Sequence, residues 1–339
     1  MGKYVVAVVG ATGAVGAEMI RVLEEQKFPV GRLVPLASEN SAGKSVEFFG
    51  EDVKVKTLTH SVFAEEKIQI ALFSAGGNVS AEFAPSAAKA GAVVIDNTSH
   101  FRMDEAVPLV VPEVNPEDIK LWKSKGIIAN PNCSTIQMMI ALKPLHDAFN
   151  LERLDIATYQ AVSGAGAKAM EELITQMQAV LNFEYDKVEP KKFPHKIALN
   201  AIPHIDSFTE SGFTKEELKM VYESQKILHN KMEVSATCVR IPVLRGHSEV
   251  IAAKFSKEVD VKEAVKLLQN GEHIVLLDEP AKNKYPMPLT VSEKDDVFVG
   301  RVRADLYDKH ILHLWIVADN LRVGAATNAV RIAQKWIEL

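Results

Sequence analysis

The sequence predicts an α/β protein with a doubly wound parallel sheet, followed by an α+β part with a mixed, largely antiparallel sheet. Two observations support this class. Through about the first 130 residues, short and continuously apolar strand segments alternate with helical segments, which is typical of a parallel sheet covered on both faces. After residue 150 the strand segments are longer, alternate in polarity and are rich in Val, Ile, Thr and Arg, which favours antiparallel pairing.

The first part begins with a strand over residues 4–10 (YVVAVVG) and a helix over 14–26, on which Met19, Val22 and Leu23 mark one face. Its other strands are expected at 32–38, 69–76, 92–99 and 126–132, and a further helix at 80–91. The second part should hold strands at 152–166, 234–255, 297–306 and 311–321, and helices at 134–149, 167–182 and 214–230. The last segment, 323–339, is an amphipathic helix that we expect to dock on the first part.

Composition excludes several function classes. A net charge of −5 gives no reason to expect nucleic-acid or membrane binding, and no apolar run is long enough to span a bilayer. The chain starts without a secretory leader, so we expect a cytoplasmic protein. Two cysteines, Cys133 and Cys238, predict free thiols, with neither a disulfide framework nor a metal site.

A glycine-rich turn joins the first strand to the first helix. Residues 10–16 (GATGAVG) have the spacing G-x-x-G-x-x-G, which differs from the usual dinucleotide fingerprint. The physical reasons for a fingerprint still apply, because glycines permit close backbone approach and a helix N-terminus offers free N–H groups to a pyrophosphate. The position favours nucleotide binding over a simple strand-to-helix turn.

The end of the second strand is ambiguous about the cofactor. A carboxylate there binds the ribose 2′-OH of NAD and repels the 2′-phosphate of NADP. Glu39 favours NAD, whereas Ser38, Ser41 and Lys44 are suited to a phosphate.

Cys133 stands between Asn-Pro-Asn and a predicted helix. A thiol in the first turn of a helix lies at the positive end of the dipole, which lowers its pKa and favours the thiolate. Neighbouring amides could also bind an oxyanion. The alternative is an inert, buried cysteine, which is how we interpret Cys238. Beside a dinucleotide loop, the junction favours a nucleophile at Cys133.

A cysteine nucleophile needs a base, and His247 is the candidate. Arg240 and His247 are seven residues apart, which places them on opposite faces of an unbroken strand. Pro242 and the step at Gly246 can bend the chain and bring them to one side.

Three further features are open to a functional or a structural interpretation. Glu216 and Lys219 share a helix face and are by default a solvated ion pair. Arg102 follows the end of a predicted strand, where ligands bind in open parallel sheets, but it also suits a surface salt bridge. The small-residue loop YQAVSGAG, residues 159–166, is either a tight turn or a place where a ligand approaches the backbone.

Taken together, several long motifs resemble the aspartate-semialdehyde dehydrogenase family of the bacterial type. In chain order they are VAVVGATGAVGAEMI, SAGKS, DNTSHFR, VPEVN, NPNCSTIQ, ATYQAVSGAG, ATCVRIPVLRGHSE and DNLRVGAATNAV. The resemblance implies a Rossmann-type NADP-binding domain at 1–131 and 321–339, and a catalytic and dimerisation domain at 132–320. It also implies a homodimer or tetramer.

The resemblance implies a role for particular residues. Cys133 matches the nucleophile that forms the acyl thioester, His247 the general acid/base, and Gln160 the residue that orients the substrate. Arg240 matches the arginine that binds the substrate's α-carboxylate, and Glu216 the acid that meets its amino group.

Phosphate binding is implied for Arg102, Asn132 and Lys219. Expected cofactor contacts are Gly10, Thr12, Gly13, Ala14, Val15, Gly16, Ser38, Asn40, Ser41, Ser163, Gly164 and Asn320. The resemblance implies NADP as the cofactor. Related sequences often have arginine where this chain has Asn40, and this departure, with Glu39 beside it, leaves NAD open.

The implied reaction reduces L-aspartyl 4-phosphate to the semialdehyde, in the biosynthesis of lysine and diaminopimelate, methionine, threonine and isoleucine. One alternative is a related acyl-phosphate reductase, such as one that acts on N-acetylglutamyl phosphate. Another is a dinucleotide-binding sensor without catalysis.

Overall fold

The structure is a computed structural model that describes residues 3–339, in which the chain divides into two compact units. The first unit contains the residues up to Asn132 together with Lys226–Leu228 and Gly324–Leu339, and the second contains Cys133–Gln225 and His229–Val323.

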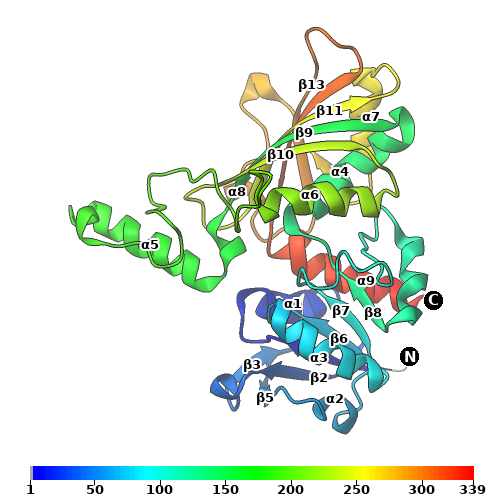
Figure 1. Ribbon diagram of the computed structural model, residues 1–339, viewed down its shortest axis with the longest axis vertical. Coiled ribbons are helices and arrows are strands. Elements are labelled where there is room, and N and C mark those ends of the chain that lie inside the picture. The colour runs from blue at the N-terminus through cyan, green and yellow to red at the C-terminus, as the bar shows by residue number, and fades with distance from the viewer. Residues whose placement is uncertain (1–2) are drawn as a thin grey trace. The chain divides into compact units, whose positions relative to one another are not determined.

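The first unit is built on a parallel sheet with the strand order β5-β2-β1-β6-β7-β8 (Figure 1). The order reverses at β1, as in doubly wound folds, and the predicted parallel sheet is confirmed. Its strands are β1 (Tyr4–Val9), β2 (Val30–Ala37), β5 (Lys56–Thr57), β6 (Ile70–Phe73), β7 (Val93–Asp96) and β8 (Ile127–Ala129).

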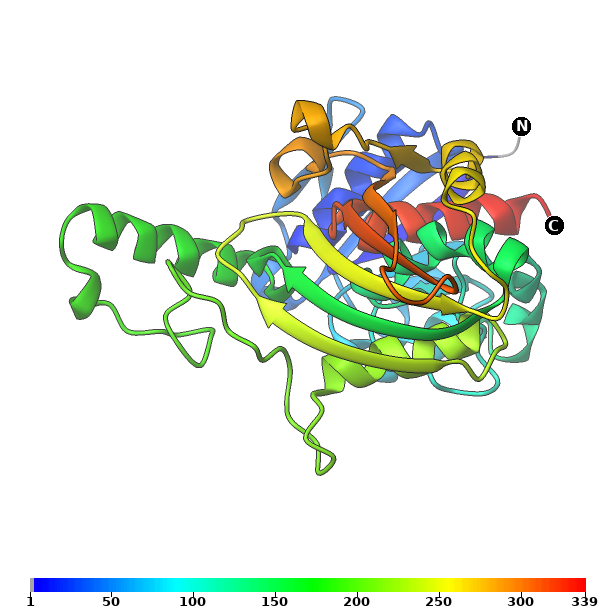
Figure 2. The ribbon, with the colours of Figure 1, turned by 90° about the horizontal axis from the view of Figure 1, so that it is seen from above.

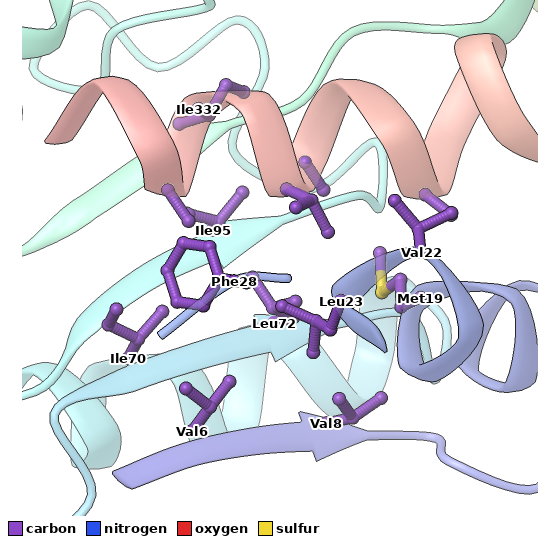
Figure 3. Close-up of a cluster of buried hydrophobic side chains, with 14 of the residues drawn as sticks. Val6, Val8, Met19, Val22, Leu23, Phe28, Ile70, Leu72, Ile95 and Ile332 are labelled. Carbon is purple, nitrogen blue, oxygen red and sulfur yellow. The ribbon is translucent and has the colours of Figure 1, made fainter. Parts of the chain in front are cut away.

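Helices cover both faces of this sheet. The helices α1 (Ala14–Glu25) and α9 (Thr327–Ile337) pack on one face, where Leu23 and Ile332 meet apolar side chains of β1, β6 and β7 (Figure 3). The helix α3 (Gly77–Lys89) packs on β6 and β7 from the other face, where the Ser80 hydroxyl donates to Asp96 at 2.7 Å. The strands are therefore buried on both sides, which explains their continuously apolar sequences.

Smaller elements complete the first unit. An antiparallel hairpin of β3 (Ser45–Phe48) and β4 (Glu51–Lys54), which sequence patterns did not predict, follows β2. The unit also contains the short helix α2 (Val62–Glu65) and the 3₁₀ segments Glu39–Ser41 and Pro116–Ser124.

The second unit contains a mixed sheet with the order β10-β9-β11-β14-β13-β12. The inner pairs β9–β11, β11–β14 and β14–β13 are antiparallel, whereas β10–β9 and β13–β12 are parallel, so the largely antiparallel sheet is confirmed. The strands are β9 (Leu151–Gln160), β10 (Glu233–Arg240), β11 (His247–Phe255), β12 (Ile274–Leu276), β13 (Val297–Ala304) and β14 (Ile311–Ala318).

The buried helix α4 (Cys133–Phe149) packs on β9, β11, β13 and β14. Within this unit α5 (Ala167–Leu181) extends away from the sheet, as Figure 2 shows. The other helices are α6 (Lys215–Ile227), α7 (Val261–Asn270) and α8 (Pro288–Val291). Across residues 3–339, no helix is long and apolar enough to cross a membrane.

Candidate active site

The candidate catalytic residues on the sheet of the second unit lie at strand ends, all at the same end of the sheet. Gln160 ends β9, Arg240 ends β10 and His247 begins β11. Register places Arg240 beside Gln160, and His247 opposite Ala318 at the end of β14. Because β11 runs antiparallel to its neighbours, its first residue meets their last residues at this end.

The backbone of one residue, Ala161, holds the side chains of both Arg240 and His247. Arg240 Nη1 donates to the Ala161 carbonyl at 2.7 Å, and the Ala161 N–H donates to His247 Nδ1 at 3.1 Å. A Cβ added at Gly164 would lie 3.0 Å from Arg240 Nη1 and 3.2 Å from His247 Nε2. The two side chains therefore point to the same place, and a side chain at position 164 would crowd both of them.

The turn between β10 and β11 produces this convergence. Gly246 has φ +95°, a left-handed conformation that favours glycine, and its N–H donates to Asn320 Oδ1 at 2.9 Å. The predicted bend near Pro242 and Gly246 is thus present, and it reverses the chain between Arg240 and His247.

Burial sets the electrostatics of these two groups. His247 is fully buried, and burial together with the charge of Arg240 holds its pKa well below the usual value. Burial also lowers the pKa of Arg240, while negative charge on Glu216 and Cys133 acts in the opposite direction. A neutral imidazole beside a guanidinium is suited to binding and polarising an anionic or carbonyl oxygen.

Glu216 is buried and Lys219 is partly buried, so the two are not a fully solvated surface pair. Lys219 Nζ lies 3.1 Å from Glu216 Oε2 and 2.9 Å from Asp206 Oδ2. Gln160 Nε2 donates to Glu216 Oε1 at 3.2 Å. Burial alone would lower the pKa of Lys219, but Glu216 and Asp206 outweigh it and raise that pKa.

A capping box sets where α6 begins and so where Glu216 and Lys219 lie. The Thr214 N–H donates to Glu217 Oε2 at 2.7 Å, and the Glu217 N–H donates to Thr214 Oγ1 at 3.3 Å. Such a cap contributes about 1 kcal/mol of stability. The start of α6 thereby places Glu216 in its first turn.

The two cysteines differ as the sequence indicated. Cys133 is half-buried and is the first residue of α4. Cys238 is fully buried, its Sγ lies 3.8 Å from Met220 Sδ, and burial raises its pKa far above the usual value. Of the two, Cys133 has the position that favours a thiolate.

Glu249 is a residue in this region that the sequence predictions did not include. It lies two residues after His247 on the same face of β11 and is fully buried. Burial raises the pKa of Glu249 well above its usual value, while the nearby side chains of Gln137 and Ser134 on α4 lower it. Burial is the larger effect, and it favours the neutral carboxyl group. The sequence could have indicated its burial, because the alternation His247, Glu249, Ile251 places Glu249 on the same face of the strand as Ile251.

Replacing Glu249 by glutamine should stabilise the protein at neutral and alkaline pH. A raised folded-state pKa gives stability that is full below the unfolded value of 4.5 and is lost as pH rises towards the folded value. Between pH 4.5 and the folded-state pKa, the free energy of unfolding of the wild type should therefore fall by about 1.4 kcal/mol per pH unit relative to that of Glu249→Gln. Urea unfolding between pH 5 and 8 measures this difference. The exposed Glu210→Gln is the control, and a difference that does not change with pH would contradict a neutral Glu249.

Two of the expected cofactor residues of the second unit bind each other. The Ser163 and Asn320 side chains are joined by a 2.9 Å hydrogen bond from Asn320 Nδ2 to Ser163 Oγ. Both are buried, and Asn320 also holds Gly246. Their contacts thus fix the loops that carry Gly164 and His247.

The glycine turn of the first unit lines a cavity of about 540 Å³. The lining residues are Gly10, Thr12, Gly13, Ala37, Ser38, Leu58, Ser74, Ala75, Val79 and Phe83. Seven of them come from the carboxyl ends of β1, β2 and β6, where nucleotides bind in such sheets, and Leu58, Val79 and Phe83 come from the end of β5 and from α3.

The backbone of this turn fits a nucleotide. Gly10 has φ +87°, and a Cβ at Gly16 would lie 2.1 Å from the Gly10 carbonyl oxygen, so both positions require glycine. The first turn of α1 begins at Ala14, directly after the cavity-lining Gly13, and its N–H groups are suited to an anion.

The other expected cofactor residues of this unit do not line the cavity. These are Ala14, Val15, Gly16, Asn40 and Ser41. Ser41 lies close by, since Thr12 Oγ1 donates to its hydroxyl at 3.4 Å. The apolar wall formed by Leu58, Val79 and Phe83 was not predicted, because these residues belong to segments without a polar motif.

Arg102 is buried and is not a surface salt bridge. Its Nε donates to the Asn130 carbonyl and its Nη2 to the Asn97 carbonyl, both at 2.9 Å. The side chains of Asn97, Asn130 and Asn328 are hydrogen-bonded in series next to it, at 2.6 Å for each pair. Asn132 is buried and adjoins Cys133 in the chain. Nothing in the sequence, apart from the matched motifs, predicted that these three asparagines would be hydrogen-bonded to one another.

Comparison with known families agrees with both units. Residues 5–122 match the family model "Semialdehyde dehydrogenase, NAD binding domain", and residues 142–323 match "Semialdehyde dehydrogenase, dimerisation domain".

Individual relatives cover nearly the whole chain. Aspartate-semialdehyde dehydrogenase of Campylobacter jejuni is 61% identical over 99% of this chain and 98% of its own, and that of Aquifex aeolicus is 55% identical over the same shares. Among solved structures, Vibrio cholerae aspartate semialdehyde dehydrogenase II complexed with ASA is 47% identical, with a TM-score of 0.96 over 100% of this chain and 99% of that one. The Candida albicans enzyme with NADP is 25% identical, with a TM-score of 0.75 over 99% of each chain. The chain therefore belongs to the aspartate-semialdehyde dehydrogenase family of oxidoreductases.

Proposed function

We propose that the protein reduces L-aspartyl 4-phosphate to L-aspartate 4-semialdehyde, with release of inorganic phosphate, through an acyl thioester on Cys133. The observation that carries this proposal is the pair of hydrogen bonds to the Ala161 backbone, which aim the Arg240 guanidinium and the His247 imidazole at Gly164. Cys133, at the N-terminus of α4, belongs to the same compact unit.

The chain's own groups are suited to each end of the substrate. Arg240 binds the α-carboxylate, for which a guanidinium fork is the matching donor. Glu216, held by Gln160 and Lys219, meets the α-amino group. Arg102, Asn132 and Lys219 bind the phosphate group.

The covalent step forms and breaks bonds at one carbon. The Cys133 thiolate attacks the acyl carbon, the C–O bond to phosphate breaks, and phosphate leaves with the electron pair. His247 stabilises the oxygen that becomes negative as the tetrahedral species form. After reduction, the C–S bond breaks, the aldehyde forms and the thiolate returns.

The proposed cofactor is NADP, held by the cavity at Gly10, Thr12, Gly13 and Ser38. When bound in its reduced form, it supplies the hydride that reduces the thioester. The Ser38 and Ser41 hydroxyls favour a 2′-phosphate, and exposed Glu39 favours NAD. The Candida albicans relative, whose structure is with NADP, supports NADP.

Glu216 favours this substrate over N-acetylglutamyl phosphate, because a carboxylate can bind a free, charged amino group and an N-acetylated substrate lacks one. A non-catalytic sensor has no need of an accessible thiol at a helix N-terminus. Rapid alkylation of Cys133, slowed by substrate, distinguishes an enzyme from a sensor.

We also propose the wider setting that the resemblance implies. The first unit is the cofactor domain, and the second carries catalysis and a homodimer interface. Apolar side chains of α5 and the turn after it support an interface, because Ile174, Met177, Leu181 and Phe183 are 44%, 50%, 77% and 98% exposed. The reaction belongs to cytoplasmic biosynthesis of lysine and diaminopimelate, methionine, threonine and isoleucine.

One steady-state assay tests the function. Aspartate semialdehyde and phosphate are supplied with either NADP or NAD, and reduction of the cofactor is followed by absorbance. We expect phosphate-dependent reduction of NADP and a lower kcat/KM with NAD. No reduction of either cofactor would overturn the proposal, and reduction without phosphate would exclude the acyl-phosphate product.

A further inference from the structure

The Lys226 side chain makes an unusual set of contacts. Its Nζ donates to the backbone carbonyl oxygens of Arg102, Asp104 and Val107, each at 2.8 Å. An ammonium group has three N–H donors, and these three carbonyls match them. Lys226 lies in the last turn of α6, in the stretch that belongs to the first unit.

The segment that Lys226 holds, residues 101–107, is a run of turns without helix or strand. Within it, two backbone hydrogen bonds are made, from the Asp104 N–H to the Phe101 carbonyl and from the Val107 N–H to the Asp104 carbonyl, both at 3.1 Å. The other backbone groups need donors or acceptors from elsewhere, because a buried carbonyl without a donor is costly. Locally, the Asp104 carboxylate accepts from the Ala106 N–H at 2.9 Å and pairs with Lys125. Lys226 supplies further donors to three backbone carbonyls of the same turns.

Arg102 is fixed at both ends by these contacts. The guanidinium donates to the carbonyls of Asn97 and Asn130, which follow β7 and β8. The Arg102 carbonyl oxygen accepts from Lys226. A shift of the Arg102 backbone would move the guanidinium relative to the Asn97 and Asn130 carbonyls, and so would change the direction in which the guanidinium is presented.

We propose that Lys226 is a positioning residue, which holds the 101–107 turns so that Arg102 presents its guanidinium to the phosphate group of the substrate. This inference rests on the proposed function. Lys226 does not contact the substrate and acts through Arg102 alone.

The first test replaces Lys226 by methionine, which keeps the length of the side chain and removes all three donors. The KM for phosphate should rise about 10-fold, with kcat and the KM for NADP within about 2-fold of wild type, because only ground-state phosphate binding is weakened. Lys226→Gln keeps two donors and should show a smaller rise. The exposed Lys231→Met is the matched control and should change none of these constants.

A double-mutant cycle separates positioning from a general structural role. In an Arg102→Ala background, Lys226→Met should change the KM for phosphate by less than about 2-fold, because the group through which it acts is absent. The same 10-fold rise in both backgrounds would overturn the inference. A loss confined to kcat, as expected if part of the protein is unfolded, would also overturn it.

Hydrogen exchange provides a readout that does not depend on turnover. The Ala106 and Val107 amides should exchange faster in Lys226→Met than in the wild type, whereas amides of β7 should not. Unchanged exchange would overturn the inference. An inactive wild type would instead overturn the proposed function, and an active wild type with an unaffected Lys226→Met variant would overturn this inference alone.

Discussion

Replacing Cys133 by alanine should lower kcat by about four orders of magnitude or more, because no other group can form the acyl thioester. The variant should still bind NADP, since the cavity at Gly10 and Gly13 belongs to the other compact unit. Steady-state turnover and a cofactor titration by fluorescence measure the two effects separately.

Cys238→Ala is the matched control. This thiol is fully buried against Met220, and its raised pKa keeps it protonated. Its removal should cost some stability through the small cavity that it leaves, and kcat should stay within about 3-fold of wild type. If Cys133→Ala retained substantial phosphate-dependent reduction, or if Cys238→Ala were the inactive variant, the nucleophile assignment would be wrong.

The parts of the fold that sequence patterns predicted are those with a local signal. The apolar run at residues 4–10 and the glycine turn after it identify β1 and the start of α1, because a buried parallel strand needs neither alternation nor a polar face. The β3–β4 hairpin, at Ser45–Phe48 and Glu51–Lys54, was not predicted because both strands have only four residues and three of the four in β4 are charged. Parallel pairing of β10 with β9 depends on contacts far apart in the chain, which periodicity does not encode.

The candidate site likewise contains residues that sequence motifs indicated and contacts that they could not indicate. Motifs indicated Cys133 and His247 as residue types at informative positions, and Pro242 and Gly246 indicated the bend between two strands. Ala161 acts through its backbone, and Lys226 through three backbone carbonyls, so no side-chain pattern could have pointed to either. Such contacts follow from the fold and not from residue type.

The second large effect is expected at His247, and its size depends on which ring nitrogen carries the proton. The Ala161 N–H is always a donor, so His247 Nδ1 must accept, and a neutral ring then carries its hydrogen on Nε2. Burial and the charge of Arg240 keep the ring neutral, because they hold its pKa well below the usual 6.5. We therefore expect His247 to donate a hydrogen bond to the reacting oxygen and not to deprotonate Cys133.

This role predicts an order among variants. His247→Ala removes the donor and should lower kcat by about 10²- to 10³-fold, the usual cost of one oxyanion donor. His247→Gln places an amide N–H close to the position of Nε2 and should lose only about 10-fold. If the imidazole instead had to take up a proton, the glutamine variant would be as slow as the alanine variant.

Two further measurements separate the donor role from that of a base. The rate at which iodoacetamide alkylates Cys133 should stay within about 2-fold in both His247 variants, because the α4 N-terminus and Arg240, and not the imidazole, favour the thiolate. The wild-type pH profile should also show no limb at the usual histidine pKa of 6.5, since the ring remains neutral through that range. Slower alkylation in both variants, together with a limb near 6.5, would make His247 the base of Cys133. In that case the ring would have to release its hydrogen bond from Ala161 in each turnover.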